Sequence, residues 1–138
     1  MIVFDRLRKY LHFLRINNAR CLPILERTDD GFRMSNRRGR SIDVRWDDVD
    51  QIVTWKVDCM VHDEIYLAFH RRSTNSWVRI GEPQGPAFLD IGFAMLKHFP
   101  NIPETWYFDV MENAFARNLT VLLNNGDSGA IHSKTQAT

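Results

Sequence analysis

The sequence predicts a single α+β domain, in which an antiparallel, curved or barrel-like sheet of about six to seven strands carries an N-terminal amphipathic helix and C-terminal capping helices. Apolar residues recur at helical spacing in residues 1–18 and 86–118, and with a period of two in residues 21–81. Strands in succession that are followed by helices are typical of an antiparallel sheet covered on one side or end. A length of 138 residues suits one domain, and a composition of 44% hydrophobic and 25% charged residues argues against a disordered chain.

The predicted N-terminal helix covers residues 1–18 and ends near two asparagines. Its apolar side chains are spaced by one, three and four positions with basic residues between them: Val3, Phe4, Leu7, Leu11 and Leu14. Three short strands follow between residues 21 and 46. Turn signals at residues 28–31 (TDDG) and 36–39 (NRRG) separate these strands, because Asp, Asn and Gly favour tight turns.

Residues 53–58 and 65–70 alternate apolar and polar side chains, which predicts two antiparallel strands joined by a bend near residues 59–63. Residues 77–80 add one more strand. The predicted core face consists of Val53, Trp55, Val57, Ile65, Leu67, Phe69, Val78 and Ile80. With the bend at residues 60–62, Tyr66 lies opposite Lys56, so that the opposite face exposes Lys56, Asp58, Tyr66, Trp77 and Arg79.

A Gly- and Pro-rich stretch at residues 81–86 stops the predicted sheet, since proline cannot donate to a central ladder. Dense apolar residues from Phe88 to Leu96 predict a helix that ends at Phe99, and a second helix begins near Trp106. Residues 119–123 predict a closing strand. The domain therefore covers residues 1–123, and residues 124–138 have the composition of a flexible tail.

The net charge of +1 is a sum of two opposed halves. Residues 1–45 hold eleven basic and five acidic side chains, a balance of +6, whereas residues 46–138 hold seven basic and twelve acidic ones, a balance of −5. The near-neutral total disfavours nucleic acid as a partner. We predict a partner-binding surface from the acids that begin the second half and from the exposed face of the strands: Asp47, Asp48, Asp50, Lys56, Asp58, Asp63, Glu64, Tyr66, Trp77 and Arg79.

Two alternatives compete with that surface. The exposed face can be solvated and held by cross-strand salt bridges, or the N-terminal helix can cover it. An anion-binding candidate lies around the second turn, at Arg33, Arg37, Arg38 and Arg40. Such a cluster can bind nucleic acid or anionic lipid, or it can be a solvated loop.

Residues 59–64 contain the one compact group of reactive side chains: Cys59, His62, Asp63 and Glu64. A structural zinc site needs about four ligands, and a nucleophilic cysteine needs a base that a third group orients. Neither requirement is met by spacing alone, so we predict no catalytic residue, metal or cofactor. Two cysteines are too few for a disulfide framework, and the N-terminus lacks a secretory apolar region, which predicts a cytoplasmic protein.

Two patterns carry a family resemblance. The hairpin entered through DDG, the segment IDVRWDDV (residues 42–49), further strand pairs and a closing helix resemble bacterial pleckstrin-homology-like (PH-like) domains, in which a strand ending in Trp and an acid precedes two hairpin strands and a capping helix. The segments WDDVxxIxxxKxD (46–58), DEIYLAF (63–69) and WYFDVxxxAFARNLTVL (106–122) resemble a group of small uncharacterised bacterial proteins. The first resemblance implies a fold, and the second implies no activity.

From these observations we predict a non-enzymatic protein-binding module of the immunity or adaptor type. Its partner would be another protein, such as a basic toxin that the acidic surface neutralises by charge complementarity. The first alternative is binding to a membrane surface or anionic lipid through the basic N-terminal half. The second is a small enzyme of unknown type that uses Cys59, His62 and Asp63.

Overall fold

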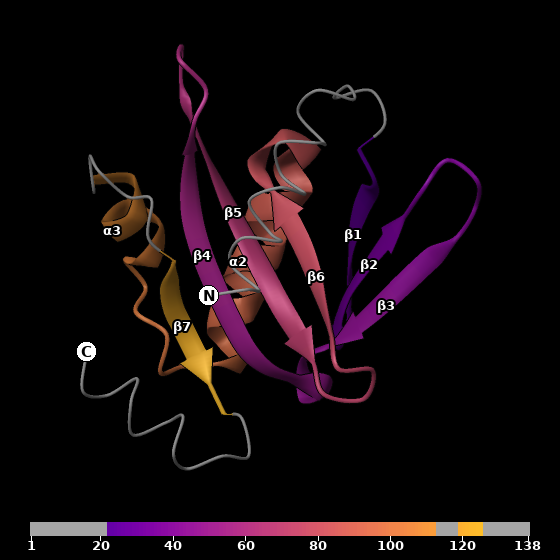
Figure 1. Ribbon diagram of the computed structural model, residues 1–138. Coiled ribbons are helices and arrows are strands. Elements are labelled where there is room, and N and C mark those ends of the chain that lie inside the picture. The colour runs from indigo at the N-terminus through magenta and orange to yellow at the C-terminus, as the bar shows by residue number, and fades with distance from the viewer. Residues whose placement is uncertain (1–21, 113–118, 126–138) are drawn as a thin grey trace.

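The computed structural model describes residues 22–112 and 119–125 (Figure 1). The predicted N-terminal helix over residues 1–18 and the predicted tail beyond residue 125 lie outside the described residues. Within them, no helix is long and apolar enough to cross a membrane. The described residues form two antiparallel sheets and two α-helices, which confirms the predicted α+β class.

The first sheet has three strands in the order β1-β2-β3: β1 (Ile24–Thr28), β2 (Gly31–Ser35) and β3 (Ser41–Arg45). The TDDG and NRRG segments form its two turns, as their composition predicts. Glycine is required where β2 begins, because a β-carbon at Gly31 would lie 1.7 Å from the main-chain oxygen of Val44 on β3.

The second sheet has four strands in the order β6-β5-β4-β7, each antiparallel to its neighbour. They are β4 (Val49–Asp58), β5 (Asp63–Arg71), β6 (Ser76–Gly81) and β7 (Thr120–Asn124). A 3₁₀ turn at Trp46–Asp48 connects the two sheets, which meet at this turn and diverge above it in Figure 1.

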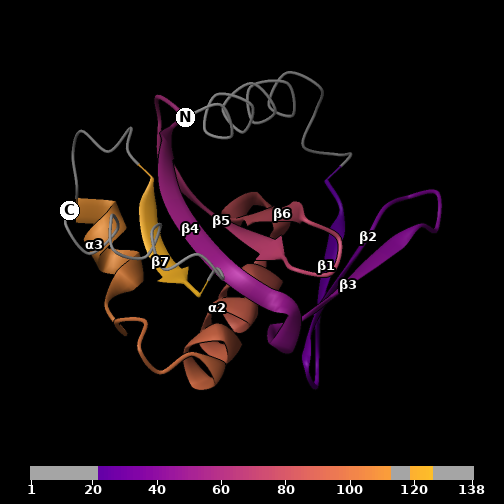
Figure 2. The same cartoon turned by 60° about the horizontal axis from the view of Figure 1, so that its bottom comes forward.

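Two helices follow β6. After a 3₁₀ turn at Glu82–Gln84, α2 (Pro86–His98) begins with proline in its first turn, where the missing N–H is not needed. The shorter α3 (Trp106–Glu112) follows a loop. Helix α2 lies behind the four-stranded sheet in Figure 1 and below it in Figure 2. It buries an apolar stripe formed by Phe88, Ile91, Gly92 and Met95.

The main core fills the space that the two sheets and the two helices enclose. Phe32 from β2, Trp46 from the connecting turn and Phe69 from β5 pack their rings together, with centroids 5.1–5.8 Å apart. The second sheet contributes Ile52, Ile65, Leu67, Phe69, Val78, Ile80 and Leu123. We call the side of the second sheet that carries these residues the core face.

A smaller apolar cluster lies on the opposite side of the same sheet, which we call the outer face. It consists of Val53, Trp55, Tyr66 and Ala68, with Val57, Trp77 and Leu119 packed against it. The prediction that Val53, Trp55 and Val57 belong to the core face is therefore wrong. β4 is apolar on both sides, because Val49 and Ile52 face the main core.

Two further corrections concern the layout. The strands form two separate sheets instead of one curved or barrel-like sheet, because the 3₁₀ turn at Trp46–Asp48 breaks the pairing between β3 and β4. Asn124 belongs to β7, where it pairs with Gln51, and not to the tail. The predicted helix continuation over residues 113–118 lies outside the described residues.

Candidate functional site

The bend between β4 and β5, residues 58–64, is an ordered turn that we call the hairpin tip. Asp58 and Asp63 are its last paired residues. Within the bend, the Cys59 N–H donates to the His62 carbonyl oxygen at 2.9 Å. The Met60 N–H donates to the Asp58 carboxylate at 2.9 Å, which supports the positive φ of 71° at Met60. Several hydrogen bonds therefore define the conformation of the tip.

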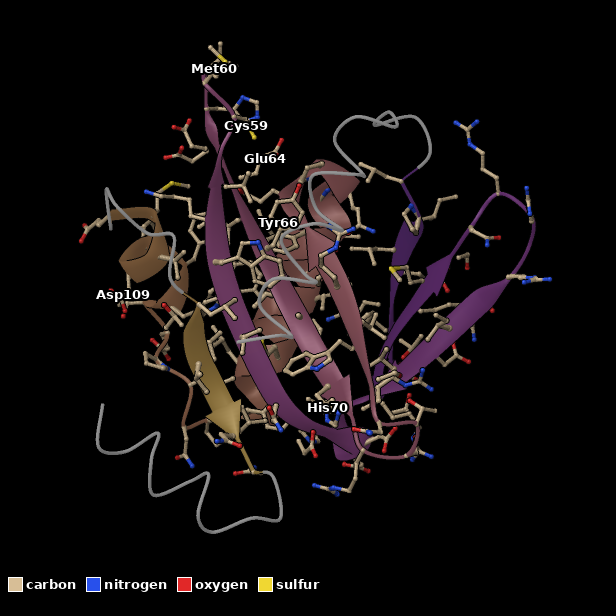
Figure 3. All side chains as sticks on the ribbon, in the orientation of Figure 1. Cys59, Met60, Glu64, Tyr66, His70 and Asp109 are labelled. Carbon is tan, nitrogen blue, oxygen red and sulfur yellow. The ribbon has the colours of Figure 1, made fainter. Side chains whose placement is uncertain are left out.

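Two apolar side chains project from the tip into solvent. Met60 is 96% exposed and Val61 is 88% exposed, the highest values among the large apolar residues that the structure describes. Figure 3 shows Met60 at the far end of the hairpin, beyond Cys59 and Glu64. Exposed apolar groups on an ordered protrusion favour contact with another molecule, because covering them removes apolar surface from water.

Cys59, His62 and Glu64 bring their side chains together at the base of the tip. One potential ligand atom from each lies within 4.8 Å of the others, and His62 Nε2 is 3.2 Å from a Glu64 carboxylate oxygen. The second Glu64 oxygen accepts a 2.9 Å hydrogen bond from the Tyr66 hydroxyl. Burial alone would raise the pKa of Glu64, but hydrogen bonds from Cys59, Tyr66 and His62 outweigh it and hold that pKa below its ordinary value.

Asp63, which the enzyme hypothesis groups with Cys59 and His62, points to the other side of the sheet. Its carboxylate lies 3.5 Å from Lys56 Nζ. Successive side chains on a strand alternate between faces, so His62 and Glu64 share one side and Asp63 takes the other. In the structure, therefore, the acid beside Cys59 and His62 is Glu64 and not Asp63.

Lys56 lies on the core face, and its side chain is only 8% exposed. Its ammonium donates to the main-chain oxygen of Met111 in the last turn of α3 at 3.1 Å. A hydrogen bond from a charged donor such as an ammonium is stronger than one between neutral groups. Lys56 therefore attaches α3 to the sheet and does not belong to an exposed surface.

The expected exposed face is divided by the strand register. Trp55 lies opposite Tyr66, whereas Lys56 lies opposite Ile65. A shift of one residue moves a whole set of side chains to the other face. Lys56 and Asp58 consequently lie on the core side together with Asp63. Tyr66, Trp77 and Arg79 lie on the outer face, so the structure divides the predicted surface between two sides of the sheet.

The outer face is itself partly buried. Tyr66 is 5% exposed, and its ring stacks on Trp55 with centroids 5.7 Å apart and planes at 11°. The guanidinium of Arg79 lies over the same ring at 5.3 Å. Burial raises the pKa of the Tyr66 hydroxyl, and the neighbouring Glu64 carboxylate raises it further, so Tyr66 remains a hydrogen-bond donor at neutral pH.

The predicted acidic surface forms two groups at opposite ends of β4. Asp58, Asp63 and Glu64 belong to the hairpin tip, whereas Asp47, Asp48 and Asp50 lie where the two sheets meet. Asp58 lies eight positions beyond Asp50 along an extended strand, a separation of about 26 Å. The two groups therefore cannot contact a single small patch of a partner.

Most of the acids near the sheet junction are already paired. The Ser73 N–H and hydroxyl both donate to Asp48, which lowers the pKa of that carboxyl. Asp50 is buried and lies 2.6 Å from His70 Nδ1. The other ring nitrogen of His70 lies 2.9 Å from the side-chain oxygen of Asn75. The sequence does not reveal this Asp50–His70–Asn75 arrangement, because no spacing signal connects residues that only the register of β4 and β5 brings together.

The four arginines of the anion-binding candidate differ in their surroundings. Arg33 on β2 forms ion pairs with Asp43 at 2.7 Å and Glu26 at 3.6 Å. The exposed turn between β2 and β3 carries the other three, Arg37, Arg38 and Arg40. The Asn36 side-chain oxygen accepts hydrogen bonds from the main-chain N–H groups of Arg38 and Arg40, and these bonds stabilise the turn.

The hairpin tip is therefore the candidate functional site that the described residues support best. It combines exposed apolar side chains, acidic charge and a cluster of potential metal ligands on one ordered turn. Comparisons of the chain with protein-family models, with curated proteins and with solved structures found no match.

Proposed function

We propose that this chain is a non-enzymatic protein-binding module whose contact element is the hairpin tip. The observation that carries the proposal is the exposure of Met60 and Val61 on a turn that hydrogen bonds hold in one conformation. An ordered turn loses little conformational entropy when it binds, so that more of the contact energy appears as affinity.

The chemistry of the tip defines the partner. Residues 58–64 contain three acids and no lysine or arginine. A complementary protein surface would offer an apolar recess for Met60 and Val61, rimmed by basic side chains that face the acids. A basic toxin neutralised by an immunity protein fits this description, as does the basic docking surface of an adaptor's target. Of the six predicted acids, Asp58, Asp63 and Glu64 belong to the tip. Asp58 is the exposed one, because Asp63 pairs with Lys56 and Glu64 accepts a hydrogen bond from Tyr66.

We also propose that the fold is PH-like. The order of elements supports this: β3 leads into Trp46 and Asp47, the β4–β5 hairpin and β6 follow, and α2 then covers the sheet. This is the order that the sequence resemblance implies. A PH-like sheet presenting a loop at one end would suit a binding module, and it does not by itself require catalysis.

The two alternative functions receive less support from the described residues. The lipid-binding hypothesis depends mainly on residues 1–18, which lie outside them, and on the turn that carries Arg37, Arg38 and Arg40. The enzyme hypothesis loses its third group, because Asp63 pairs with Lys56. Both remain predictions, as does the cytoplasmic location.

Site-specific photocrosslinking tests the proposal. A photoreactive amino acid replaces Met60 in one variant and, as a matched control, the 63% exposed Phe93 of α2 in another. Both variants are produced in the native cells and irradiated. We expect one protein of basic surface charge to be crosslinked from position 60 and not from position 93. Equal crosslinking from both positions, or none from position 60, would contradict the proposal.

A further inference from the structure

The geometry of the hairpin tip points to a metal site: we propose that Cys59, His62 and Glu64 bind one zinc ion. The proposal goes beyond protein binding and does not depend on it. The closest pair, His62 Nε2 and a Glu64 oxygen, is 3.2 Å apart. In a tetrahedral zinc site, nitrogen and oxygen ligands lie about 3.3 Å from each other, and pairs that include sulfur about 3.6 Å.

The remaining distances need only small side-chain movements. All three ligand atoms lie within 4.8 Å of one another, and His62 and Cys59 both belong to the exposed bend. The His62 side chain is 60% exposed, so its ring can rotate without displacing a neighbour from the core. Contraction of the cluster around an ion therefore leaves the sheet unchanged.

The main chain holds the ligands in place before an ion arrives. The Cys59 N–H donates to the carbonyl oxygen of His62, which fixes the separation of the first two ligands. Glu64 lies two residues beyond His62 and projects from the same side of β5. A site built within six residues of one hairpin needs no rearrangement of distant elements.

Tyr66 acts on the cluster through Glu64. Its hydroxyl donates to one carboxylate oxygen at 2.9 Å and leaves the other directed at His62. Outer groups of this kind orient metal ligands and strengthen binding. The ring of Tyr66 is fixed against Trp55, so the orientation of Glu64 is fixed in turn. Tyr66 is a positioning residue in this site and not a ligand.

The donor set selects the kind of metal. One thiolate, one imidazole and one carboxylate suit zinc, whereas magnesium and calcium prefer oxygen ligands alone. Three protein ligands leave the fourth tetrahedral position for water or for a group of a bound partner. The sequence predicts no metal here, because a structural zinc site needs about four ligands. The structure supplies three and a solvent-facing side at His62.

Zinc binding by the purified full chain is measured by competition with a colorimetric chelator. We expect one zinc ion per chain, and at least a tenfold loss of affinity in each of Cys59→Ser, His62→Ala and Glu64→Gln. Tyr66→Phe should weaken binding about tenfold. His98→Ala on α2 and Asp63→Asn on the other side of β5 serve as matched controls and should bind as the wild type does. Cobalt provides a second readout, because a thiolate–cobalt absorption band should appear in the wild type and be lost in Cys59→Ser.

Three results would overturn the metal site. They are binding of clearly less than one zinc per chain, wild-type affinity in Cys59→Ser and Glu64→Gln, or binding that is lost only when His12 or His132 is replaced. The exposed side chain of His62 makes His62→Ala a variant that should keep the wild-type thermal midpoint. A chain that binds zinc but crosslinks to no protein from position 60 would refute the proposed function alone, and the reverse result would refute this site alone.

Discussion

Gly81 on β6 lies directly opposite Tyr66 on β5, and a β-carbon added to Gly81 would come within 2.3 Å of the Tyr66 ring. The ring cannot move aside easily, because it stacks on Trp55 and its hydroxyl donates to Glu64. The absence of a side chain at Gly81 therefore allows the tyrosine to lie flat on the outer face and to reach the hairpin tip.

We predict that Gly81→Ala lowers the free energy of unfolding by about 1–3 kcal/mol, the usual cost of overpacking. Urea denaturation of the variant and the wild type measures this loss. In a Tyr66→Ala background the same substitution should cost less than about 0.5 kcal/mol, because the obstacle is gone. Gly92→Ala is the matched control: its added carbon would be 3.4 Å from Trp106, and alanine favours the helix, so no loss is expected. Similar losses in both single variants would show that the Tyr66 contact is not the cause.

Replacement of Lys56 tests whether it fastens α3 to the sheet. Lys56→Met keeps the aliphatic length of the side chain but removes the donor to the carbonyl oxygen of Met111. We expect a loss of about 1–3 kcal/mol in the free energy of unfolding, because the substitution removes both this charged hydrogen bond and the ion pair with Asp63. The exposed Lys97 of α2 is the control, and Lys97→Met should change stability by no more than about 0.5 kcal/mol. Equal effects of the two substitutions would argue against the buried contact.

Two acids of the predicted acidic surface differ in their role: Asp50 is buried and pairs with His70, whereas Asp47 is exposed. Asp50→Ala should lower the free energy of unfolding by about 1.5–3 kcal/mol, because a charged hydrogen bond at 2.6 Å is lost. Asp47 has a side chain that is 75% exposed, so Asp47→Ala should cost at most about 0.5 kcal/mol. Chemical denaturation of both variants decides the matter, and a harmless Asp50→Ala would contradict this arrangement.

Tyr107 makes stability depend on pH in the alkaline range. Burial, followed by its hydrogen bond to Glu82, raises the pKa of Tyr107 from 10.0 to about 12. The folded state therefore holds this proton more tightly than the unfolded state does. The resulting stabilisation is fully present below pH 10 and is lost as the pH rises from 10 to about 12. Over that interval the unfolding free energy of Tyr107→Phe should fall less steeply than that of the wild type, whereas parallel curves would exclude this role.

The strands and helices of the described residues follow closely from the sequence, because their apolar periodicity and turn residues are local signals. The placement of Trp55 and Lys56 does not follow. β4 has apolar residues on both sides, so alternation identifies two faces without showing which one the helices cover. A bend placed one residue away pairs Tyr66 with Lys56 instead of with Trp55, which reverses the predicted faces of the β4 residues, whereas the predicted faces of β5 and β6 are confirmed.

The candidate site illustrates the same limit. Cys59, His62 and Glu64 are close in sequence, and their grouping is visible there, but the choice of Glu64 over Asp63 depends on the direction of each side chain at the bend. The exposure of Met60 also depends on the turn, because nothing in a bare sequence distinguishes an apolar residue at a tip from one in a core.

The affinity of the crosslinked partner for variants of the tip tests the protein-binding function most directly. Titration calorimetry is carried out with the purified wild type, with Met60→Asp and with the control Phe93→Asp, all of which place a charge at an already exposed position. The protein-binding account predicts at least a tenfold weaker affinity for Met60→Asp and an affinity within about twofold of wild type for Phe93→Asp. Wild-type affinity in Met60→Asp would contradict it.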